Sequence, residues 1–166
     1  MPGAPAWRLE APDLTVSFVD GVYGQVSENL KTDCGDFVLR RADGVYAYQL
    51  AEVVDDADNS VTQVVRGRDL LASTPRQIFL FSLLGKPAPA YYHVPLLLAP
   101  DGRRLSKRDG DLDLDSLLGR FSPEEIIGAL AHAAGLIEKK EPISAAELAA
   151  IFDWGKVRKE DICLTL

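Results

Sequence analysis

Four cations gather in one short turn of the sequence: Arg103, Arg104, Lys107 and Arg108, within GRRLSKRDGD at positions 102 to 111. Like charges this close repel each other, so the cluster needs counter-charge from the fold, from solvent ions or from a ligand. The turn follows an apolar run, and α/β sheets place ligand-binding loops after such strands. The pattern therefore favours a phosphate-bearing ligand, although a basic turn taken alone is more often a solvated surface loop.

The overall charge does not decide between these readings. The chain of 166 residues has a formal net charge of −7, which at first argues against a nucleic-acid partner. A phosphate, however, responds to charges within about one Debye length, roughly 10 Å at 0.1 M salt, and the basic residues come in small local groups. A hydrophobic content of 47% and a charged content of 26% are typical of a globular protein. No apolar run approaches the about 20 residues of a membrane span.

The residue types that bind metals are sparse and scattered. Cys34 and Cys163 stand far apart and outside a CxxC spacing, which is typical of reduced thiols in a cytosolic protein and argues against zinc. His93 and His132 are the only histidines, and their separation argues against a metal site or a catalytic triad. The Asp55–Asp56 pair is either a contact for a metal or a nucleic acid or the start of a solvated loop.

The elements before the turn begin with a β-like region from Leu14 to Arg66. LTVSF at 14–18 alternates as a strand does, and DFVLRR at 36–41 is followed by an Ala-Asp-Gly turn signal. Because VYAYQLAEVV comes directly after that turn, residues 36–54 are predicted to form a hairpin. VTQVVRG at 61–67 is predicted to be a short, largely buried strand.

The pattern becomes helical after this strand. Thr74, Pro75 and Gln77 have the spacing of a capping box with proline at the first helical position, which predicts a helix that ends at Gly85. The apolar strand at 94–100 then leads into the basic turn. Strand, helix and strand in this order predict a parallel sheet of the α/β class.

The last third of the chain is predicted to be helical. Ser122 with Glu125 and Ser144 with Glu147 have the capping-box spacing, and Gly135 is suited to end the first of these two helices. Two domains follow from this reading: residues 1–111 as a partial α/β domain with the basic loop, and residues 112–166 as a small helical domain.

Several motifs together resemble a known family. RLSKR at 104–108 is similar to the second signature motif of class I aminoacyl-tRNA synthetases, in the form that glutamyl enzymes use. AYQLAEVVDD, VVRGRDLL and STPRQI resemble segments of the same catalytic half, in the same order and spacing. The resemblance spans about residues 11–166 and is strongest to the short glutamyl-queuosine tRNA(Asp) synthetase branch. It implies the second half of a Rossmann-type catalytic domain with a stem-contact-like helical domain appended.

The resemblance implies a ligase that activates glutamate with ATP and transfers it to tRNA. Lys107 matches the catalytic lysine, whose ammonium would meet the departing pyrophosphate mainly in the transition state and so lower the barrier. The ATP-binding residues that it implies are Arg104, Leu105, Ser106, Lys107 and Arg108. Magnesium would arrive with ATP, held more by phosphate oxygens than by protein. No zinc site is expected in this chain.

Tyr48 and Arg66 match the positions that hold glutamate in this family. The phenol would donate to the polar end of the amino acid, and the guanidinium would satisfy a carboxylate in a way that neutral isosteres do not allow. Considered without the family, a packed strand tyrosine and a salt-bridged arginine are the favoured interpretations, because both residue types are common at such positions.

The first signature motif of the family, of the His-x-Gly-His type, does not occur in this sequence. We therefore expect the chain to be the C-terminal portion of such a synthetase and to form no adenylate unaided. One alternative is a non-catalytic tRNA-binding or regulatory module derived from a synthetase. Another is a folding unit without activity that self-associates through an exposed sheet edge. A cytoplasmic location is expected, and the site of charging on tRNA, at the 3′ end or on a modified anticodon base, stays open.

Overall fold

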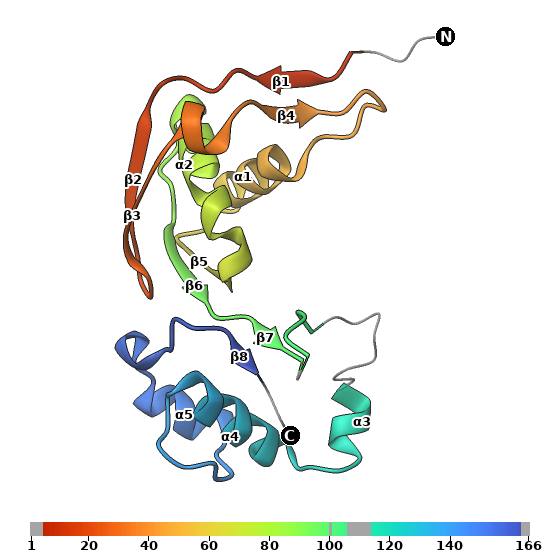
Figure 1. The fold of residues 1–166 in the computed structure, drawn as a ribbon, viewed down its shortest axis with the longest axis vertical. Coiled ribbons are helices and arrows are strands. Elements are labelled where there is room, and N and C mark those ends of the chain that lie inside the picture. Colours follow the sequence, from red (N-terminus) through yellow and green to blue (C-terminus); the bar gives the residue numbers. More distant parts are fainter. Residues whose placement is uncertain (1–4, 100, 106–113, 164–166) are drawn as a thin grey trace. The chain divides into compact units, whose positions relative to one another are not determined.

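The structure is a computed structural model that describes residues 5–99, 101–105 and 114–163 (Figure 1). It contains two compact units, Met1–His93 and Val94–Leu166. The domain boundary predicted at residues 111 and 112 lies outside the described residues. No helix in the described part of the chain combines the length and the hydropathy that a membrane crossing requires.

The first unit alternates short strands with helices, which confirms the mixed α/β class. Its elements in chain order are β1 (Trp7–Leu9), β2 (Thr15–Asp20), β3 (Gly24–Asn29), a π-helical turn η1 (Leu30–Cys34), β4 (Phe37–Arg40), α1 (Tyr48–Asp58), β5 (Gln63–Gly67), a 3-10 helix η2 (Arg68–Ser73), α2 (Thr74–Leu83) and β6 (Ala90–Val94). β1 pairs antiparallel with β4, and β2 pairs antiparallel with β3 in a hairpin. β5 and β6 form a third two-stranded sheet.

The hairpin predicted over residues 36–54 is wrong in its second half. The chain does turn back after β4, with an antiparallel bridge between Arg40 and Tyr46, but Tyr48 then begins the helix α1. The stretch Gln49–Glu52 consists of good helix formers, and their preference prevails over the β-prone residues around them. The packing of α1 on α2 further stabilises the helix, because Val53 is 1% exposed and lies in one cluster with Leu80 and Phe81 of α2 (Figure 1).

α2 is a helix as predicted, but its predicted capping box is wrong. Ser73 is the N-cap, but its side chain makes no capping hydrogen bond and instead accepts from Nε2 of Gln49 at 3.0 Å. Thr74 and Gln77, the residues expected to cap, point into the interior and are 0% and 1% exposed. The predicted end is confirmed, since Gly85 takes the left-handed φ of 64° that glycine tolerates best. The polar side chains at the start of α2 therefore serve the interior of the unit.

The second unit is mainly helical. Its elements are β7 (Leu97–Leu98), α3 (Leu114–Leu118), α4 (Pro123–Ala134), α5 (Ala145–Ile151), a 3-10 helix η4 (Trp154–Lys156) and β8 (Ile162–Cys163), and β7 pairs parallel with β8. Both capping boxes predicted here are confirmed, at Ser122 and at Ser144. Gly135 ends α4 in the left-handed conformation, with φ of 86°.

Gly128 of α4 lies against the backbone of the loop before α5. A Cβ at this position would lie 1.9 Å from the carbonyl oxygen of Glu141. Helix propensity favours alanine over glycine by about 1 kcal/mol, but a rigid backbone clash costs typically 1–3 kcal/mol and prevails here. We expect Gly128→Ala to lower the free energy of unfolding of the second unit, measured as faster amide hydrogen exchange in α4.

Gly119→Ala is the matched control for this prediction. A Cβ at Gly119 would meet its nearest neighbour, the carbonyl oxygen of Ser116, at 3.5 Å, which is an ordinary contact. Exchange in α4 should therefore stay unchanged in this variant. Equal exchange rates in the two variants would show that the approach at Gly128 does not constrain the fold.

Candidate functional site

A buried guanidinium lies at the end of β5. The side chain of Arg66 is only 9% exposed and forms an ion pair with Glu52 of α1, with Nη1 2.8 Å from Oε1. Its Nε donates to Nε2 of His93 in β6 at 3.0 Å. The salt-bridged arginine that the sequence left open is thus present, and its partners come from two further elements.

The start of α2 supplies the remaining partners of Arg66. Its Nη2 donates to Oγ1 of Thr74 at 2.9 Å and to Oε1 of Gln77 at 2.6 Å. Gln77 in turn donates through Nε2 to Oε2 of Glu52 at 2.8 Å. Both oxygens of Glu52 are therefore engaged, and the ion pair has a fixed orientation. The polar pair mistaken for a cap is part of this site.

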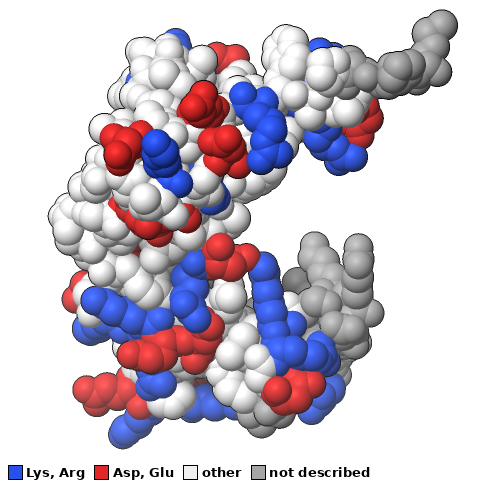
Figure 2. All heavy atoms as spheres, turned by 45° about the horizontal axis from the view of Figure 1, so that its top comes forward, with Lys and Arg blue, Asp and Glu red and all other residues white. Residues whose placement is uncertain are grey.

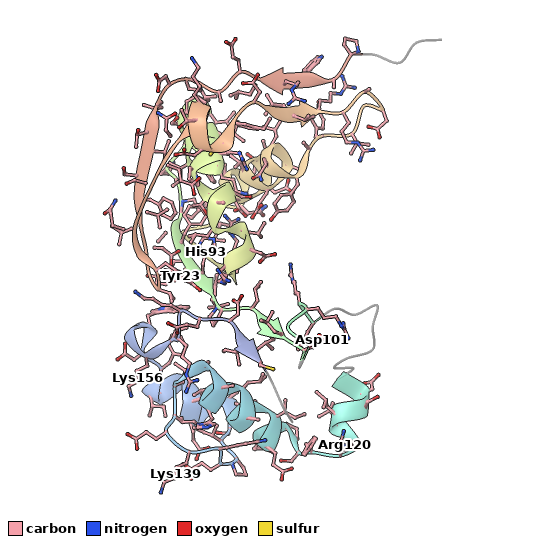
Figure 3. The ribbon with its side chains drawn as sticks, viewed as in Figure 1. Tyr23, His93, Asp101, Arg120, Lys139 and Lys156 are labelled. Carbon is pink, nitrogen blue, oxygen red and sulfur yellow. The ribbon has the colours of Figure 1, made fainter. Side chains whose placement is uncertain are left out.

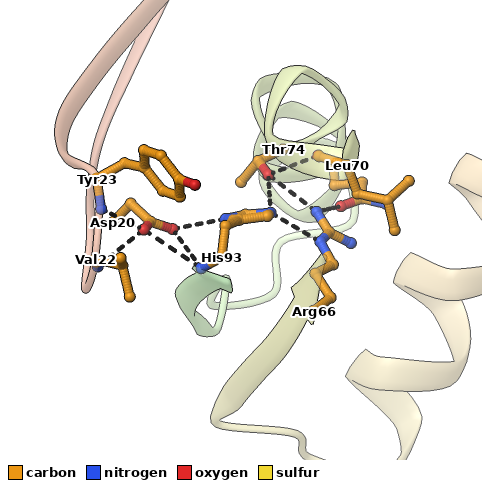
Figure 4. A network of polar contacts seen from close by, with 8 residues as sticks. Asp20, Val22, Tyr23, Arg66, Leu70, Thr74 and His93 are labelled. Atoms are coloured by element: carbon orange, nitrogen blue, oxygen red, sulfur yellow. Dashed lines mark hydrogen bonds and ion pairs between the residues drawn. The ribbon is translucent and has the colours of Figure 1, made fainter. Parts of the chain in front are cut away.

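Behind Arg66 lies a second buried pair, Asp20 and His93 (Figure 4). Their side chains are both 0% exposed, and Nδ1 of His93 lies 2.6 Å from Oδ2 of Asp20. The other oxygen of Asp20, Oδ1, accepts from the backbone N–H groups of Val22 and Tyr23 in the turn of the β2–β3 hairpin. A continuous set of hydrogen bonds thus runs from this turn through His93 to Arg66.

The protonation of this pair follows from its partners. Burial opposes the charge of Asp20, but hydrogen bonds from Tyr23, His93 and Val22 outweigh it and hold the pKa of the carboxyl below its usual 3.8. Burial also lowers the pKa of His93 below its usual 6.5, assisted by the charge of Arg66 and opposed by Asp20. His93 is therefore neutral at pH 7, beside an ionised Asp20.

Tyr48 brings a phenol to the same guanidinium. Loss of hydration and a hydrogen bond with the Glu52 carboxylate raise the pKa of Tyr48 to about 12. Its hydroxyl also lies within hydrogen-bonding reach of Arg66, while 53% of the residue remains exposed. Tyr48 and Arg66 thus converge on Glu52, and Tyr48 does so from the first turn of a helix. Burial and the charge of Glu52 raise the pKa of Asp56, one helical turn further along.

An aromatic ring covers the guanidinium. Arg66 lies over the ring of Tyr91 with its central carbon 5.2 Å from the ring centroid, and the rings of Tyr91 and His93 stack at 6.2 Å. Such packing excludes water and strengthens the hydrogen bonds beneath it. The arrangement presents a fixed cation and a phenol, which is the chemistry that recognises a carboxylate.

The basic turn belongs to the second unit and is described only in part. Leu105 donates its N–H to the carbonyl of Leu97 at 3.0 Å, and Arg104 forms an antiparallel bridge with Leu98. Asp101 (Figure 3) supplies counter-charge to Arg103, with Oδ2 3.0 Å from Nε. Ser106, Lys107 and Arg108, the core of the predicted phosphate loop, lie outside the described residues.

Neither a cluster of metal ligands nor a patch of one charge marks a second site among the described residues. Among them, no group of three or more His, Cys, Asp or Glu side chains could hold a metal ion. On the face drawn in Figure 2, Lys and Arg are interspersed with Asp and Glu. Cys34 and Cys163 are both free thiols. The Tyr48–Arg66 site is therefore the candidate that geometry favours.

The sequence pointed to two residues of this site and missed five. Tyr48 and Arg66 were identified through the family motifs alone. The residues that were missed are Asp20, Glu52, Thr74, Gln77 and His93. One signal was available, because His93 is a polar residue inside the apolar strand AYYHV and such residues need buried partners.

The neutral state of His93 makes the stability of the first unit depend on pH. Between the lowered pKa of folded His93 and 6.5, the unfolded chain binds more protons than the folded chain, so acid favours unfolding. Stability should thus fall as the pH drops below about 6.5, and again below about 3.8 as Asp20 protonates. Urea denaturation between pH 8 and pH 3 measures this. His93→Asn should flatten the first step and His132→Asn should keep it; an unchanged midpoint between pH 8 and pH 5 would contradict the assignment.

Comparison with known proteins gives a consistent result. The model of the family described as tRNA synthetases class I (E and Q), catalytic domain, matches residues 4–160. A glutamyl-Q tRNA(Asp) synthetase from Symbiobacterium thermophilum is 46% identical over 160 residues, which are 95% of this chain and 49% of that protein. One from Nitratidesulfovibrio vulgaris is 53% identical over 134 residues, 80% of this chain and 41% of that protein. The chain spans about half the length of the curated relatives it matches.

Solved structures agree with the sequence relatives. A crystal structure of a glutamate tRNA ligase from Elizabethkingia meningosepticum, in complex with its amino acid, matches with a TM-score of 0.78 and 30% identity, over 95% of this chain and 36% of that one. The glutamate-tRNA synthetase from Elizabethkingia anophelis matches with the same TM-score and 28% identity. The resemblance predicted from the motifs is confirmed: the chain belongs to the class I tRNA synthetase family of the E and Q type and carries part of its catalytic domain.

Proposed function

We propose that the Tyr48–Arg66 site binds the side-chain carboxylate of glutamate, in an enzyme that activates glutamate with ATP and transfers it to tRNA. One observation carries this proposal: a guanidinium 9% exposed and oriented by four side chains, next to a phenol that remains half open to solvent. A guanidinium held in place loses little freedom when it binds a carboxylate. Family membership supports the same amino acid, because the relatives named above are glutamate enzymes.

Glu52 shapes how a ligand would bind. It already shares Nη1 of Arg66, so an incoming carboxylate has to meet the edge of the guanidinium that faces Tyr48. There it would accept a hydrogen bond from the second N–H of Nη1 and, when the hydroxyl turns away from Glu52, one from the phenol. The amide of glutamine would place its NH2 group against the N–H of Arg66 or the hydroxyl of Tyr48. Two donors would then face each other without an acceptor, and a buried site discriminates strongly against such a ligand.

The phosphate chemistry is assigned to the basic turn. We assign Arg104, Leu105, Ser106, Lys107 and Arg108 to the triphosphate of ATP, with Lys107 as the catalytic residue. Its ammonium would stabilise the charge that develops on the departing pyrophosphate. Magnesium would come bound to the nucleotide, in keeping with its preference for phosphate oxygens and water. The support is the family match across this turn.

The second unit is assigned to tRNA. Arg120, Lys139 and Lys156 are exposed on it (Figure 3). Cations of this kind bind the phosphate backbone with an affinity that falls as salt rises. The proposed setting is the cytoplasm, where tRNA and ATP are available.

Tyr48→Phe tests the glutamate site with little disturbance of the fold. The change removes only the hydroxyl, so the affinity for glutamate should fall about tenfold, the cost of one hydrogen bond to a charged group. An NMR titration of the chain with glutamate, followed at the Nε signal of Arg66, measures the dissociation constant. Tyr46→Phe is the matched control, since Tyr46 is 58% exposed and lies against Arg40. Glutamate that produces no shift at Arg66 in the unsubstituted chain would refute the proposed site.

Lys107→Ala tests the assignment of the basic turn. In an enzyme that carries this chain, we expect ATP–pyrophosphate exchange to slow about 100-fold in kcat, with a smaller change in the KM for ATP, because the ammonium acts mainly in the transition state. Lys86→Ala removes an exposed lysine of the first unit and should leave exchange unchanged. An equal loss in the two variants would assign the effect to overall charge and exclude a catalytic Lys107.

A further inference from the structure

The guanidinium of Arg66 obtains its direction from His93. An arginine nitrogen only donates, so Nε2 of His93, 3.0 Å from Nε of Arg66, must accept. Its lone pair has to point at Arg66, and the ring proton must then sit on Nδ1. His93 is therefore held in one of its two neutral tautomers, and the doubly protonated ring is incompatible with this contact.

Asp20 is the group that selects this tautomer. Its Oδ2 lies 2.6 Å from Nδ1 of His93. An ionised carboxylate can only accept a hydrogen bond, so Nδ1 must be the donor. Its Oδ1 is occupied by the N–H groups of Val22 and Tyr23, so the carboxylate does not rotate freely. Oδ1 thus holds the hairpin turn and Oδ2 holds the imidazole, and both oxygens also accept from the backbone N–H of His93, at 3.3 Å and 3.2 Å (Figure 4).

We propose that Asp20 and His93 are positioning residues of the glutamate site: Asp20 sets the tautomer of His93, and the Nε2 lone pair of His93 sets the direction of the Arg66 guanidinium. The inference rests on the proposed function of Arg66 and extends it to two residues that no ligand would touch. It also gives the β2–β3 hairpin a role in the site, because the hairpin turn fixes the Asp20 carboxylate, which holds His93 and through it Arg66.

The charged groups around His93 are consistent with this arrangement. Asp20 from β2 and Asp69 from η2 favour a proton on the ring, whereas Arg66 from β5 and burial oppose it. Thr74 of α2 adds a hydroxyl 3.3 Å from Nε2, which adjusts to either tautomer. The tautomer of His93 therefore depends on Asp20 and not on the hydroxyl, which also accepts from Nη2 of Arg66.

Nitrogen NMR of the histidine rings tests the first step without any ligand. In the unsubstituted chain at pH 7.5, His93 should show a protonated Nδ1 and an unprotonated Nε2, and the Nε–H of Arg66 should exchange slowly with water. His132 is the only other histidine and gives an internal reference. A His93 protonated on Nε2, or on both nitrogens, would overturn the proposal.

Asp20→Asn reverses the direction of one hydrogen bond while keeping the shape. With the asparagine carbonyl still on the hairpin turn, its amide nitrogen replaces Oδ2 and faces Nδ1 as a donor. The ring proton should then move to Nε2, opposite the Nε–H of Arg66. We expect the Arg66 Nε–H to lose its protection and the affinity for glutamate to fall about tenfold. An unchanged tautomer together with unchanged Arg66 exchange would contradict the proposal.

Two substitutions of His93 separate positioning from general support of the fold. The side-chain amide of glutamine reaches about as far as Nε2, so His93→Gln retains an acceptor for Arg66 but not the contact with Asp20. Asparagine reaches only as far as Nδ1, so His93→Asn keeps Asp20 satisfied and leaves Arg66 without its acceptor. Glutamate affinity should stay within about threefold of the unsubstituted chain in His93→Gln and fall about tenfold in His93→Asn. Equal losses in both variants would point to a purely structural role.

The two proposals fail separately. In one case the unsubstituted chain binds no glutamate, but His93 has the expected tautomer, and Asp20→Asn reverses the tautomer and removes the protection of the Arg66 Nε–H. The positioning of Arg66 by Asp20 and His93 then holds, and the assignment of Arg66 to glutamate is wrong. If glutamate binds but the tautomer does not respond to Asp20→Asn, the function holds and the positioning pair is wrong. If a variant does not fold, which far-UV circular dichroism reveals, the other substitutions still decide.

Discussion

The constraint on which the first unit depends is the burial of one positive charge. A guanidinium removed from water needs hydrogen bonds on nearly all of its N–H groups, because an unpaired buried donor costs about 1–3 kcal/mol and an unpaired charge more. Arg66 meets this requirement with Glu52 of α1, His93 of β6 and two side chains of α2. Elements far apart in the sequence are therefore held at one point, and the same contacts that stabilise the unit orient the cation.

This constraint explains which parts of the fold were predictable from the sequence. Local signals gave correct results where the decisive contacts are local: the capping boxes at Ser122 and Ser144 and the glycine stop at Gly85 depend on residues within one turn. They failed where a distant partner competes for the same side chain. The Thr74–Gln77 spacing is that of a cap, but the buried guanidinium is charged and attracts both side chains more strongly than a backbone N–H does.

The site shows the same division between local and distant information. Tyr48 and Arg66 were recognised because family motifs preserve their surroundings in the sequence. Asp20 lies 73 positions from His93, and no pattern along the chain connects an aspartate in a hairpin turn with a histidine in a distant strand. Periodicity reports burial, and it does not report which buried polar groups meet. The helix at Tyr48 was predicted as a strand because β-prone residues flank the helix formers Gln49–Glu52, and because its packing on α2 adds stability that no local pattern reports.

The charges around Arg66 show how the site would distinguish ligands. Asp20, Glu52 and Asp56 bring more negative charge to this region than Arg66 brings positive charge, and Glu52 together with burial raises the pKa of Asp56. The net charge of this region therefore does not attract the carboxylate of a ligand from a distance. Selection has to come from donors that are fixed in direction at short range, where hydrogen bonds to a charged acceptor are strongest. Donors work in this way only when their own orientation is determined in advance, and a guanidinium anchored by four side chains satisfies that condition.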